Sequence, residues 1–324
     1  MAGRQLKELF RAFHTRDELA FRRAALEIIE EERGKHHNAL ARDLQGLLVS
    51  GGAPLDYGAT VLLPSPPKDR EGEWELGEVR TPERMLEELI LTKSVLVKLE
   101  NLISEVQQWD ILDAAGISRR QKVVFQGPPG CGKTSAAEAL AYGLGRPLLV
   151  VRLDSIVSSY LGETASNLRR ILDFASEAPF VVLFDEFDAL GRSRDDDTEH
   201  GEMKRVVTAF LQMTDRYVGP SLLLAATNHP KLLDGALWRR FDEVLTFALP
   251  TVPQIRQLLR LRLKTVPHSG IDVYKYASAL QGLPHAAAEK LVMDARRNAI
   301  LRNSKYVEEI DLESARPGIL SRPW

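Results

Sequence analysis

The sequence predicts an α/β fold in which helices flank a parallel sheet and a purely helical region follows. Short apolar runs alternate with stretches of helical periodicity, and from Pro253 onward the pattern is helical only. The runs are apolar on both faces, as expected of buried parallel strands. They are Lys122–Gln126, Leu148–Leu153, Val181–Phe184, Leu222–Ala226 and Val244–Phe247. A chain of 324 residues, 44% hydrophobic and 27% charged, has enough apolar material for a sizeable core.

The N-terminal residues 1–50 are predicted to form a small bundle of two or three helices. Thr15 and Glu18 fit a capping box at a helix start. A helical stripe of leucines then ends at a glycine pair; its members are Leu40, Leu44, Leu47 and Leu48. Nine Lys/Arg residues against eight Asp/Glu residues leave this region nearly neutral.

Residues 51–80 are rich in proline and glycine, which predicts a linker or a segment that lies extended on another part of the protein. Trp74 and Leu76 leave a docking contact open as an alternative to a plain tether. After this segment, Thr81 followed by Pro82 predicts the start of a helix, with Thr81 as its cap.

A glycine-rich segment follows the first predicted strand and opens a helix. Its sequence, GPPGCGKT, matches the phosphate-binding P-loop pattern GxxxxGK[ST] in the strand–loop–helix context that the pattern requires. Backbone amides can surround a phosphate there, and the helix N-terminus adds positive charge. Lys133 is expected to reach the terminal phosphates of ATP, and the Thr134 hydroxyl to bind Mg²⁺. The predicted nucleotide-binding residues are Gly127, Pro128, Pro129, Gly130, Cys131, Gly132, Lys133, Thr134, Ser135 and Asp185.

Two predicted strands end in polar side chains that complete this site. Asp185 and Glu186 follow the apolar run Val181–Phe184. Asp185 is expected to bind Mg²⁺ together with Thr134, and Glu186 to orient and deprotonate the attacking water. Asn228 follows the run Leu222–Ala226, and its amide is expected to position the same water; in isolation it would be read as a turn-forming residue.

The motifs GPPGCGKT, LFDEFDAL, AATN and ALWRRFD, in this order and spacing, resemble those of the AAA+ ATPases. The resemblance is narrower to the AAA branch that includes spastin, katanin, the ESCRT-disassembly ATPases and the FtsH-type membrane proteases. It covers roughly residues 81–316 and does not reach residues 1–80. It implies a P-loop sheet of order 5-1-4-3-2 in a large subdomain at residues 81–250, then a helical lid at residues 251–316 and a tail at residues 317–324.

The resemblance also implies a homo-oligomeric ring, usually a hexamer, with each ATP between two protomers. Arg239 and Arg240 match the position of the family's arginine fingers, which would reach the γ-phosphate in the neighbouring subunit. The implied catalytic set is therefore Glu186, Asn228, Arg239 and Arg240. Alternatively, Arg239 and Arg240 are simply a pair of exposed surface arginines.

Tyr160, Leu161 and Gly162 match the aromatic–hydrophobic–glycine loop that faces the central pore in this family. There they would grip an extended polypeptide substrate; alternatively, Tyr160 and Leu161 pack beneath a neighbouring loop. Ser159 stands where relatives often carry a lysine. Residues 191–200 would form a second pore loop or an ordinary solvated loop.

One segment of the predicted lid departs from the family. Residues 282–289, GLPHAAAE, occupy the place of the G-x-S-G-A-D segment that lines adenine and ribose. Gly282 and Ala286 fit this pattern, whereas Pro284, His285 and Ala287 do not, so the contacts on that side of the nucleotide stay open. No second sensor arginine is identified, because Arg296 and Arg297 are expected on a surface or between subunits.

The sequence thus predicts a Mg²⁺-dependent ATPase that pulls, unfolds or remodels a protein substrate. The chain has no HExxH or GxSxG motif, so any proteolysis is expected from a separate partner, with the N-terminal region recruiting a protease or an adaptor. The alternative is a nucleic-acid motor or loader, since residues 251–324 carry twelve Lys/Arg against seven Asp/Glu. The net charge of −2 gives no general basic field in its favour. A nucleotide-switched adaptor is disfavoured because the catalytic residues are present.

A cytoplasmic location without a membrane span is expected. No apolar run is longer than five residues, and the N-terminus lacks a secretory signal pattern. The single cysteine, Cys131, cannot form an internal disulfide, which is typical of a reducing compartment.

Overall fold

The computed structural model describes most of the chain after residue 73. The described residues are 64–69, 74–151, 153–156, 161–190, 208–230 and 238–324, together with Phe10, Ala24 and Ile28. The chain divides into two units, Met1–Thr60 and Val61–Trp324. Apart from Phe10, Ala24 and Ile28, the predicted N-terminal bundle lies outside the described residues, as do most of the predicted linker, Tyr160 and residues 191–200. Within the described part, no helix is long and apolar enough to cross a membrane.

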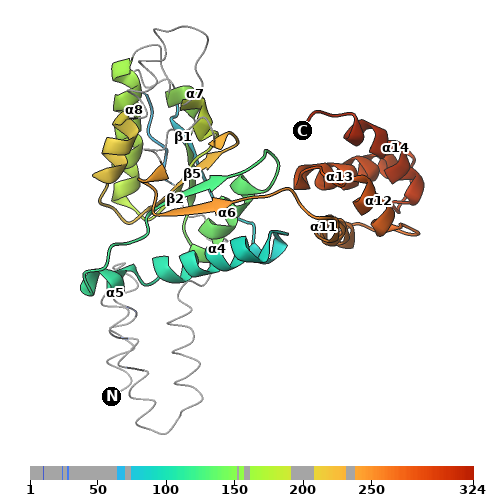
Figure 1. Cartoon of the computed structure of the whole chain (residues 1–324), viewed down its shortest axis with the longest axis horizontal. Coiled ribbons are helices and arrows are strands. Elements are labelled where there is room, and N and C mark those ends of the chain that lie inside the picture. Colours follow the sequence, from blue (N-terminus) through green and yellow to red (C-terminus); the bar gives the residue numbers. More distant parts are fainter. Residues whose placement is uncertain are drawn as a thin grey trace. The chain divides into compact units, whose positions relative to one another are not determined.

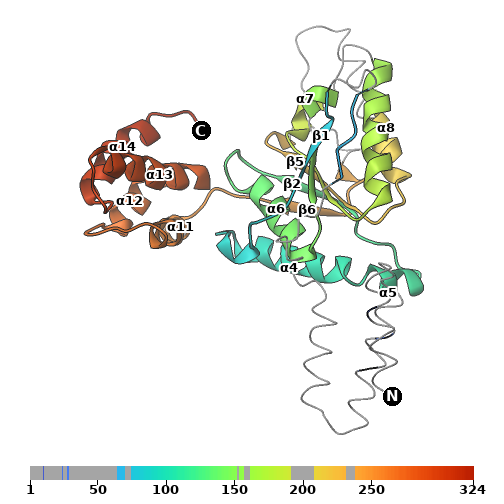
Figure 2. The ribbon, with the colours of Figure 1, turned by 180° about the vertical axis from the view of Figure 1, so that it is seen from behind.

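The second unit contains a sheet of six described strands in the order β1-β3-β4-β5-β2-β6 (Figures 1 and 2). Five of these strands are parallel and correspond to the predicted apolar runs: β2 (Lys122–Gln126), β3 (Leu148–Val151), β4 (Val181–Phe184), β5 (Leu222–Thr227) and β6 (Glu243–Thr246). When these five parallel strands are numbered 1 to 5 along the chain, their order in the sheet, starting from the β6 edge, is 5-1-4-3-2, as expected. The predicted α/β fold is confirmed, and the sheet differs from the prediction by one additional strand.

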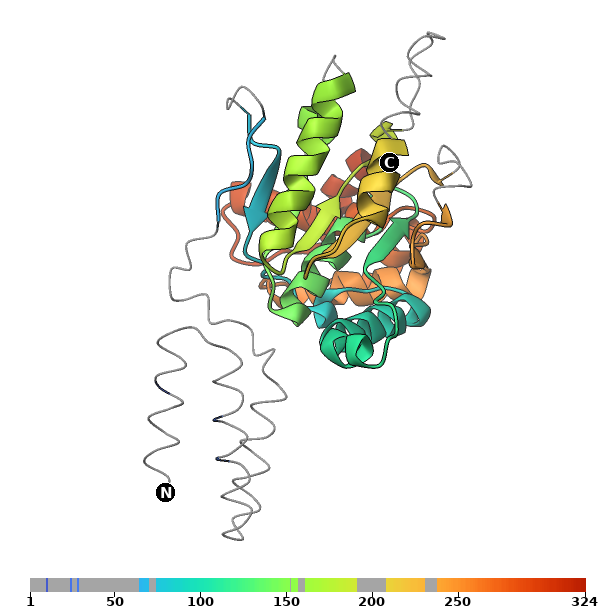
Figure 3. The ribbon, with the colours of Figure 1, turned by 90° about the vertical axis from the view of Figure 1, so that its left-hand side faces the viewer.

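The additional strand, β1 (Gly77–Arg80), lies within the segment that the sequence predicts to be a linker. It pairs antiparallel with β3, from Gly77 opposite Val151 to Arg80 opposite Leu148, and forms one edge of the sheet (Figure 3). Leu76, immediately before it, is fully buried, whereas Trp74 is 65% exposed. The sequence left open that Trp74 and Leu76 dock on another part of the protein. Leu76 does so, and Trp74 does not.

Helices cover both faces of the sheet, because alternate residues of each strand point to opposite sides. Val123 and Phe125 of β2 pack on the side of α4 (Lys93–Val106) and α6 (Lys133–Leu144). Val124 packs on the side of α8 (Leu161–Glu177), which Figure 1 shows across the sheet from α4 and α6. The short helices α5 (Trp109–Ala114) and α7 (Leu153–Ile156) add Trp109 to the first core and Leu153 and Ile156 to the second. Burial on both sides explains why the strands are continuous apolar runs.

The helix predicted to begin at Thr81 begins later in the structure, and that prediction is wrong. The α4 helix starts at Lys93, where the Thr92 hydroxyl accepts a hydrogen bond from the Val95 amide at 3.4 Å. The preceding residues are extended apart from a short 3₁₀ turn, η1 (Leu86–Glu88). Leu89 and Ile90 are both buried there, so tertiary packing overrides the local start signal at Thr81.

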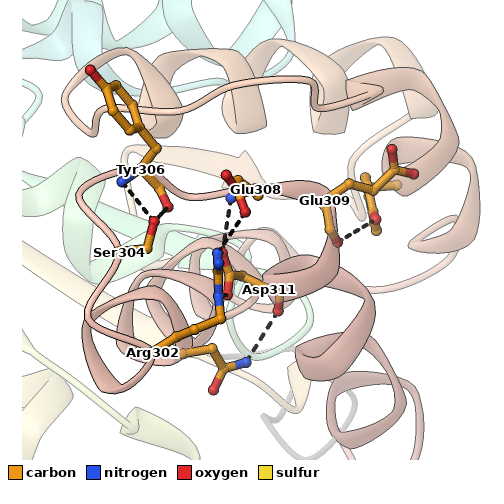
Figure 4. Close-up of polar contacts among 8 residues, drawn as sticks. Arg302, Ser304, Tyr306, Glu308, Glu309 and Asp311 are labelled. Carbon is orange, nitrogen blue, oxygen red and sulfur yellow. Dashed lines mark hydrogen bonds and ion pairs between the residues drawn. The ribbon is translucent and has the colours of Figure 1, made fainter.

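The C-terminal part is a cluster of helices with its own core. They are α11 (Val252–Lys264), α12 (Val273–Ala279), α13 (His285–Leu301) and α14 (Glu309–Leu320). The α14 helix continues past residue 316, and Ile319 and Trp324 contribute to this core. Figure 4 shows how Arg302, at the end of α13, forms ion pairs at 2.9 Å with Glu308 and the buried Asp311, which joins α13 to α14.

Candidate nucleotide-binding site

The P-loop connects β2 to α6 at the carboxyl edge of the sheet, and its first glycine is fixed between two strands. The Gly127 amide donates to the Thr227 carbonyl at 3.2 Å. Its φ is 147°, and a Cβ atom at this position would lie 2.1 Å from the carbonyl oxygen of Phe247. Only glycine fits there, because any side chain would collide with the backbone that follows β6.

The Lys133 side chain points back into the loop that precedes it. It is 6% exposed, and its ammonium donates to the carbonyls of Gly127 at 2.8 Å and Pro128 at 2.9 Å, and to Asn228 Oδ1 at 2.7 Å. Burial lowers the pKa of Lys133, while the nearby Cys131 and Asp185 act in the opposite direction. The predicted phosphate-binding lysine and the predicted water-positioning amide are therefore in direct contact.

Thr134 and Asp185 form a second contact across the site. The Thr134 hydroxyl donates to Asp185 Oδ2 at 2.7 Å, which brings two hard oxygen atoms together at the start of α6. Such a pair suits Mg²⁺, which is usually held by one or two protein oxygens together with water and substrate phosphates. The residues present therefore fit the expected metal ion.

Glu186 has an unusual backbone conformation next to this pair. Its φ is +51°, which places a non-glycine residue in the left-handed region, and its side chain is exposed. Its amide donates to Asp185 Oδ1 at 2.9 Å. Strained conformations of this kind concentrate at functional sites, where the surrounding structure holds them.

Asp188 is a residue of the site that the sequence reasoning missed. It lies in the short helix η2 (Phe187–Leu190) and is 1% exposed. Its Oδ1 atom accepts from the Asn228 amide at 3.0 Å and from the Thr227 hydroxyl at 3.2 Å. The end of β4 is thereby tied to the end of β5. The sequence signal that could have identified Asp188 is its place as the second aspartate of the motif LFDEFDAL.

The P-loop and the residues that follow β4 and β5 line a cleft of about 320 Å³. Of the predicted residues, it contains Pro129 to Ser135, Asp185, Glu186 and Asn228. Pro128 contributes through its carbonyl, and the thiol of Cys131 is buried, which raises its pKa. Ser135 accepts a hydrogen bond from Arg84 at 2.7 Å.

The other wall of the cleft comes from two further segments. One is the extended stretch before α4, which the sequence reasoning did not assign, and the other is the helical cluster after β6, where the resemblance placed residues 282–289 beside adenine and ribose. They contribute Arg84, Glu88, Leu89, Ile90, Leu91, Leu258, Arg262, His285, Ala286 and Glu289. The Ala286 amide donates to the Gly130 carbonyl at 3.1 Å, so α13 contacts the P-loop directly. Residues 282–289 therefore reach the cleft although their sequence departs from the family pattern.

Arg239 and Arg240 lie on the surface, away from the described lining of this cleft. Arg240 forms an ion pair with Asp215, whereas Arg239 forms none with the described residues. The adjacent Trp238 and Phe241 pack against the core on the α8 side. Both arginines are therefore exposed residues of a segment that is held by these two aromatic side chains.

The predicted pore-loop residues are described only in part. Leu161 and Gly162 form the first turn of α8. Tyr160 lies outside the described residues.

Comparisons with known proteins identify the family. The sequence profile of the ATPase family associated with various cellular activities (AAA) matches residues 123–249. An uncharacterised AAA family ATPase of Sinorhizobium fredii, y4kL, is 40% identical over 315 residues, which is 97% of this chain and 94% of the relative.

Two further relatives are similar over the ATPase region only. A proteasome-activating nucleotidase of Thermococcus onnurineus is 32% identical over 213 residues, covering 64% of this chain and 54% of the relative. The ATP-dependent zinc metalloprotease FtsH of Lactiplantibacillus plantarum is 32% identical over 209 residues, covering 62% of this chain and 28% of the relative. With the P-loop cleft, these matches show that the chain belongs to the AAA family of the AAA+ ATPases and is an ATPase.

Proposed function

We propose that the cleft binds ATP with Mg²⁺ and that two contacts described above define the roles of Lys133, Asn228, Thr134 and Asp185. The observation that carries this assignment is the pair of short contacts Lys133–Asn228 and Thr134–Asp185. Lys133 holds the terminal phosphates, and Asn228 orients the attacking water. Thr134 and Asp185 hold the metal ion, which supplies charge neutralisation at the β- and γ-phosphates when bound. Glu186 accepts the proton of the water.

Two substitutions separate binding from hydrolysis. Lys133→Ala should abolish ATP binding, because it removes the cation at the centre of the loop. Glu186→Gln should keep ATP affinity and lower kcat by about 10²–10⁴-fold, the usual contribution of general-base catalysis. Equilibrium binding of a fluorescent ATP analogue and steady-state phosphate release measure the two effects. Equal loss of affinity in both variants would contradict the role given to Glu186.

We further propose that the chain assembles into a homo-oligomeric ring, a hexamer, and remodels or unfolds protein substrates. The similarity to a proteasome-activating nucleotidase and to FtsH supports this function. Tyr160, Leu161 and Gly162 would contact the substrate polypeptide in the pore. The chain carries no HExxH motif, so a protease would be a separate partner, recruited like an adaptor through residues 1–50.

Stimulation of ATP hydrolysis tests the substrate class. Casein, an unstructured polypeptide, should stimulate phosphate release by the wild-type protein. Tyr160→Ala should lose this stimulation while keeping basal hydrolysis, because it removes apolar surface worth about 1.5–3 kcal/mol on burial. Tyr160→Phe should retain the stimulation, since it keeps the ring. Parallel loss of stability, basal hydrolysis and stimulation in Tyr160→Ala would favour a packing role for Tyr160.

A nucleic-acid motor is the second candidate, and one observation favours it. Arg256, Arg260 and Lys264 follow one another at four-residue spacing along α11, and none forms an ion pair with the described residues. Stimulation by single-stranded DNA, with an affinity that falls steeply as salt rises, would support this function in place of protein remodelling.

A further inference from the structure

The charged groups assigned so far in the cleft act on the outer two phosphates of ATP. Lys133 is expected at the β- and γ-phosphates, and a metal ion held by Thr134 and Asp185 neutralises the same two groups. The α-phosphate also carries a negative charge, and the roles given so far supply it only with backbone amides of the loop. A further cation near the start of α6 would complete the neutralisation of the nucleotide.

Arg84 lies beside the residue that follows Thr134. It belongs to the stretch before α4 and lines the cleft. Its Nη1 atom donates to the Ser135 hydroxyl at 2.7 Å. Ser135 is in the first turn of α6, and its side chain leaves the helix about 100° around the axis from that of Thr134. Arg84 is therefore next to the P-loop but on a different side of this turn from the metal-binding pair.

This position is where the polar and apolar parts of the cleft meet. The apolar part includes Leu89 and Leu91, and a Cβ atom on Gly132 would lie 3.6 Å from Leu91. Arg84 precedes both leucines in the same stretch and contacts Ser135 on the other side. A nucleotide with its outer phosphates at Lys133 and its base in the apolar part has its α-phosphate between the two.

The guanidinium of Arg84 keeps donors for a ligand. Among the described residues, only Ser135 accepts a hydrogen bond from it, because its Nε atom lies 3.8 Å from Glu138 Oε2. An arginine has five N–H donors, and the Arg84 side chain is 31% exposed. The Ser135 oxygen accepts from Arg84, so the proton of this hydroxyl is available to donate in turn.

Arg262, the other arginine in the described lining, is committed to a carboxylate. Its Nε atom donates to Glu289 Oε1 at 3.0 Å and its Nη2 atom to the same oxygen at 2.5 Å. Two hydrogen bonds to one carboxylate largely neutralise this guanidinium. Arg84 is therefore the arginine of the described lining whose charge is better placed to act on a ligand.

We propose that Arg84 is a further phosphate-binding residue, which contacts the α-phosphate of the nucleotide together with the Ser135 hydroxyl. This inference rests on ATP binding at the cleft. A planar guanidinium presents paired donors that match two phosphate oxygens, whereas ribose hydroxyls are typically bound by a carboxylate. Because ATP and ADP share the α-phosphate, Arg84 holds the nucleotide equally before and after hydrolysis.

The test uses ligands that differ at the α-phosphate. ATP, ADP and the two diastereomers of ATP with sulfur on the α-phosphorus would be titrated, with Mg²⁺, into the wild-type protein and the variants Arg84→Ala, Arg84→Lys and Glu138→Gln. Sulfur is a weak hydrogen-bond acceptor, so each diastereomer weakens the contacts of one non-bridging oxygen. Arg80→Ala is the matched control, because Arg80 pairs with Glu78 and is not part of the described lining.

Arg84→Ala should weaken ATP and ADP by the same factor of about ten, since both complexes lose one charge-assisted hydrogen bond. The KM for ATP should rise with little change in kcat, as expected when a contact is equal in the ground and transition states. The wild type should prefer one sulfur diastereomer, and Arg84→Ala should reduce that preference. Arg84→Lys should recover part of the ATP affinity, because it keeps the charge without the planar fork.

Glu138→Gln distinguishes phosphate binding from a structural link between α6 and the stretch before α4. It removes the charge that faces Arg84 but keeps an oxygen that can accept from the Glu83 amide, as Glu138 does at 3.4 Å. We expect ATP affinity to stay the same or rise, because Arg84 loses a competing anion. The melting temperature of Arg84→Ala should fall by at most about 4 °C, because a partly exposed ion pair contributes little.

Three results would overturn the proposal in a wild-type protein that binds ATP. They are unchanged ATP and ADP affinities in Arg84→Ala, an identical diastereomer ratio in Arg84→Ala and the wild type, and an equal loss of ATP affinity in Arg84→Ala and Glu138→Gln. The last would make Arg84 a structural link. Absence of ATP binding in the wild type would contradict the nucleotide site as a whole and Arg84's role with it.

Discussion

At the scale of single residues, Asp188 connects the two strand ends that carry proposed catalytic groups. Its carboxylate accepts from the Asn228 amide and the Thr227 hydroxyl in a fully enclosed position. Lys133 in turn donates to the Asn228 side chain. The position of the lysine ammonium therefore depends on a residue that is itself outside the described lining of the cleft.

Substitution of Asp188 tests this dependence. Asp188→Ala leaves the buried Thr227 hydroxyl and the half-buried Asn228 amide without this acceptor, so the free energy of unfolding should fall by about 1–3 kcal/mol. We expect kcat to fall as well, because Asn228 loses its support. Urea denaturation and phosphate release measure the two quantities.

The matched control is Asp188→Asn, which keeps an oxygen acceptor at the same place. It should retain most of the stability and more of kcat than Asp188→Ala. A destabilised Asp188→Ala protein whose folded fraction turns over ATP at the wild-type rate would mean that Asp188 supports the fold alone.

At the scale of elements, the P-loop and α13 meet at Gly130. Gly130 has φ +68°, and a Cβ atom there would approach Ala286 to 2.9 Å. Gly130→Ala should therefore push α13 away from the loop and weaken ATP binding, in addition to the strain of a left-handed alanine.

Gly116→Ala provides the control for this strain. Gly116 has φ +70°, and nothing lies within 4 Å of its added Cβ atom. Each variant should lose about 1–2 kcal/mol of stability from the left-handed conformation, but only Gly130→Ala should weaken ATP binding. Thermal unfolding and nucleotide titration of both proteins make the comparison. Equal ATP affinities would show that the contact between the two elements does not shape the cleft.

The edge strand β1 gives a second prediction at this scale. Leu76→Ala should destabilise the protein by about 2–5 kcal/mol, because it opens a cavity beneath the sheet. Trp74→Ala removes a larger but 65% exposed side chain and should change stability by less than about 0.5 kcal/mol. Chemical denaturation of the two variants distinguishes an integral strand from a tether. Similar, small effects of both substitutions would contradict the integral strand.

The elements with a strong local signal were predictable from the sequence, and those fixed by distant contacts were not. The five parallel strands appear as apolar runs because both of their faces are buried. β1 was hidden because its neighbours are proline- and glycine-rich and its pairing with β3 is remote in sequence. The P-loop and the pair Thr134–Asp185 follow from motifs, whereas Leu89, Ile90 and Arg262 reach the cleft only through tertiary packing.

At the scale of the whole molecule, Arg239 and Arg240 are the site residues that the fold does not bring to the cleft. They are exposed and absent from its described lining, so they would contact nucleotide only in another subunit. The Arg240–Asp215 ion pair does not prevent this, because the guanidinium is 54% exposed and surface ion pairs contribute only about 0–1 kcal/mol. The proposed ring gives both arginines a function that a single chain cannot.

Mixing of variant subunits tests whether the arginines act between chains. Arg239→Ala and Arg240→Ala should each lower kcat, by up to the ~10³–10⁵-fold typical of an arginine finger, and leave ATP affinity unchanged. A Glu186→Gln subunit still carries both arginines, and an Arg239→Ala subunit still carries Glu186. Where the two meet in the productive order, one intact site forms, so mixtures of two inactive proteins should hydrolyse ATP.

Exchange of subunits would be verified with fluorescently labelled chains, and Lys133→Ala mixed with Glu186→Gln serves as the control, because neither contributes an intact cleft. An absence of activity at every mixing ratio, in rings that have exchanged subunits, would place the arginines' action within one chain or outside catalysis.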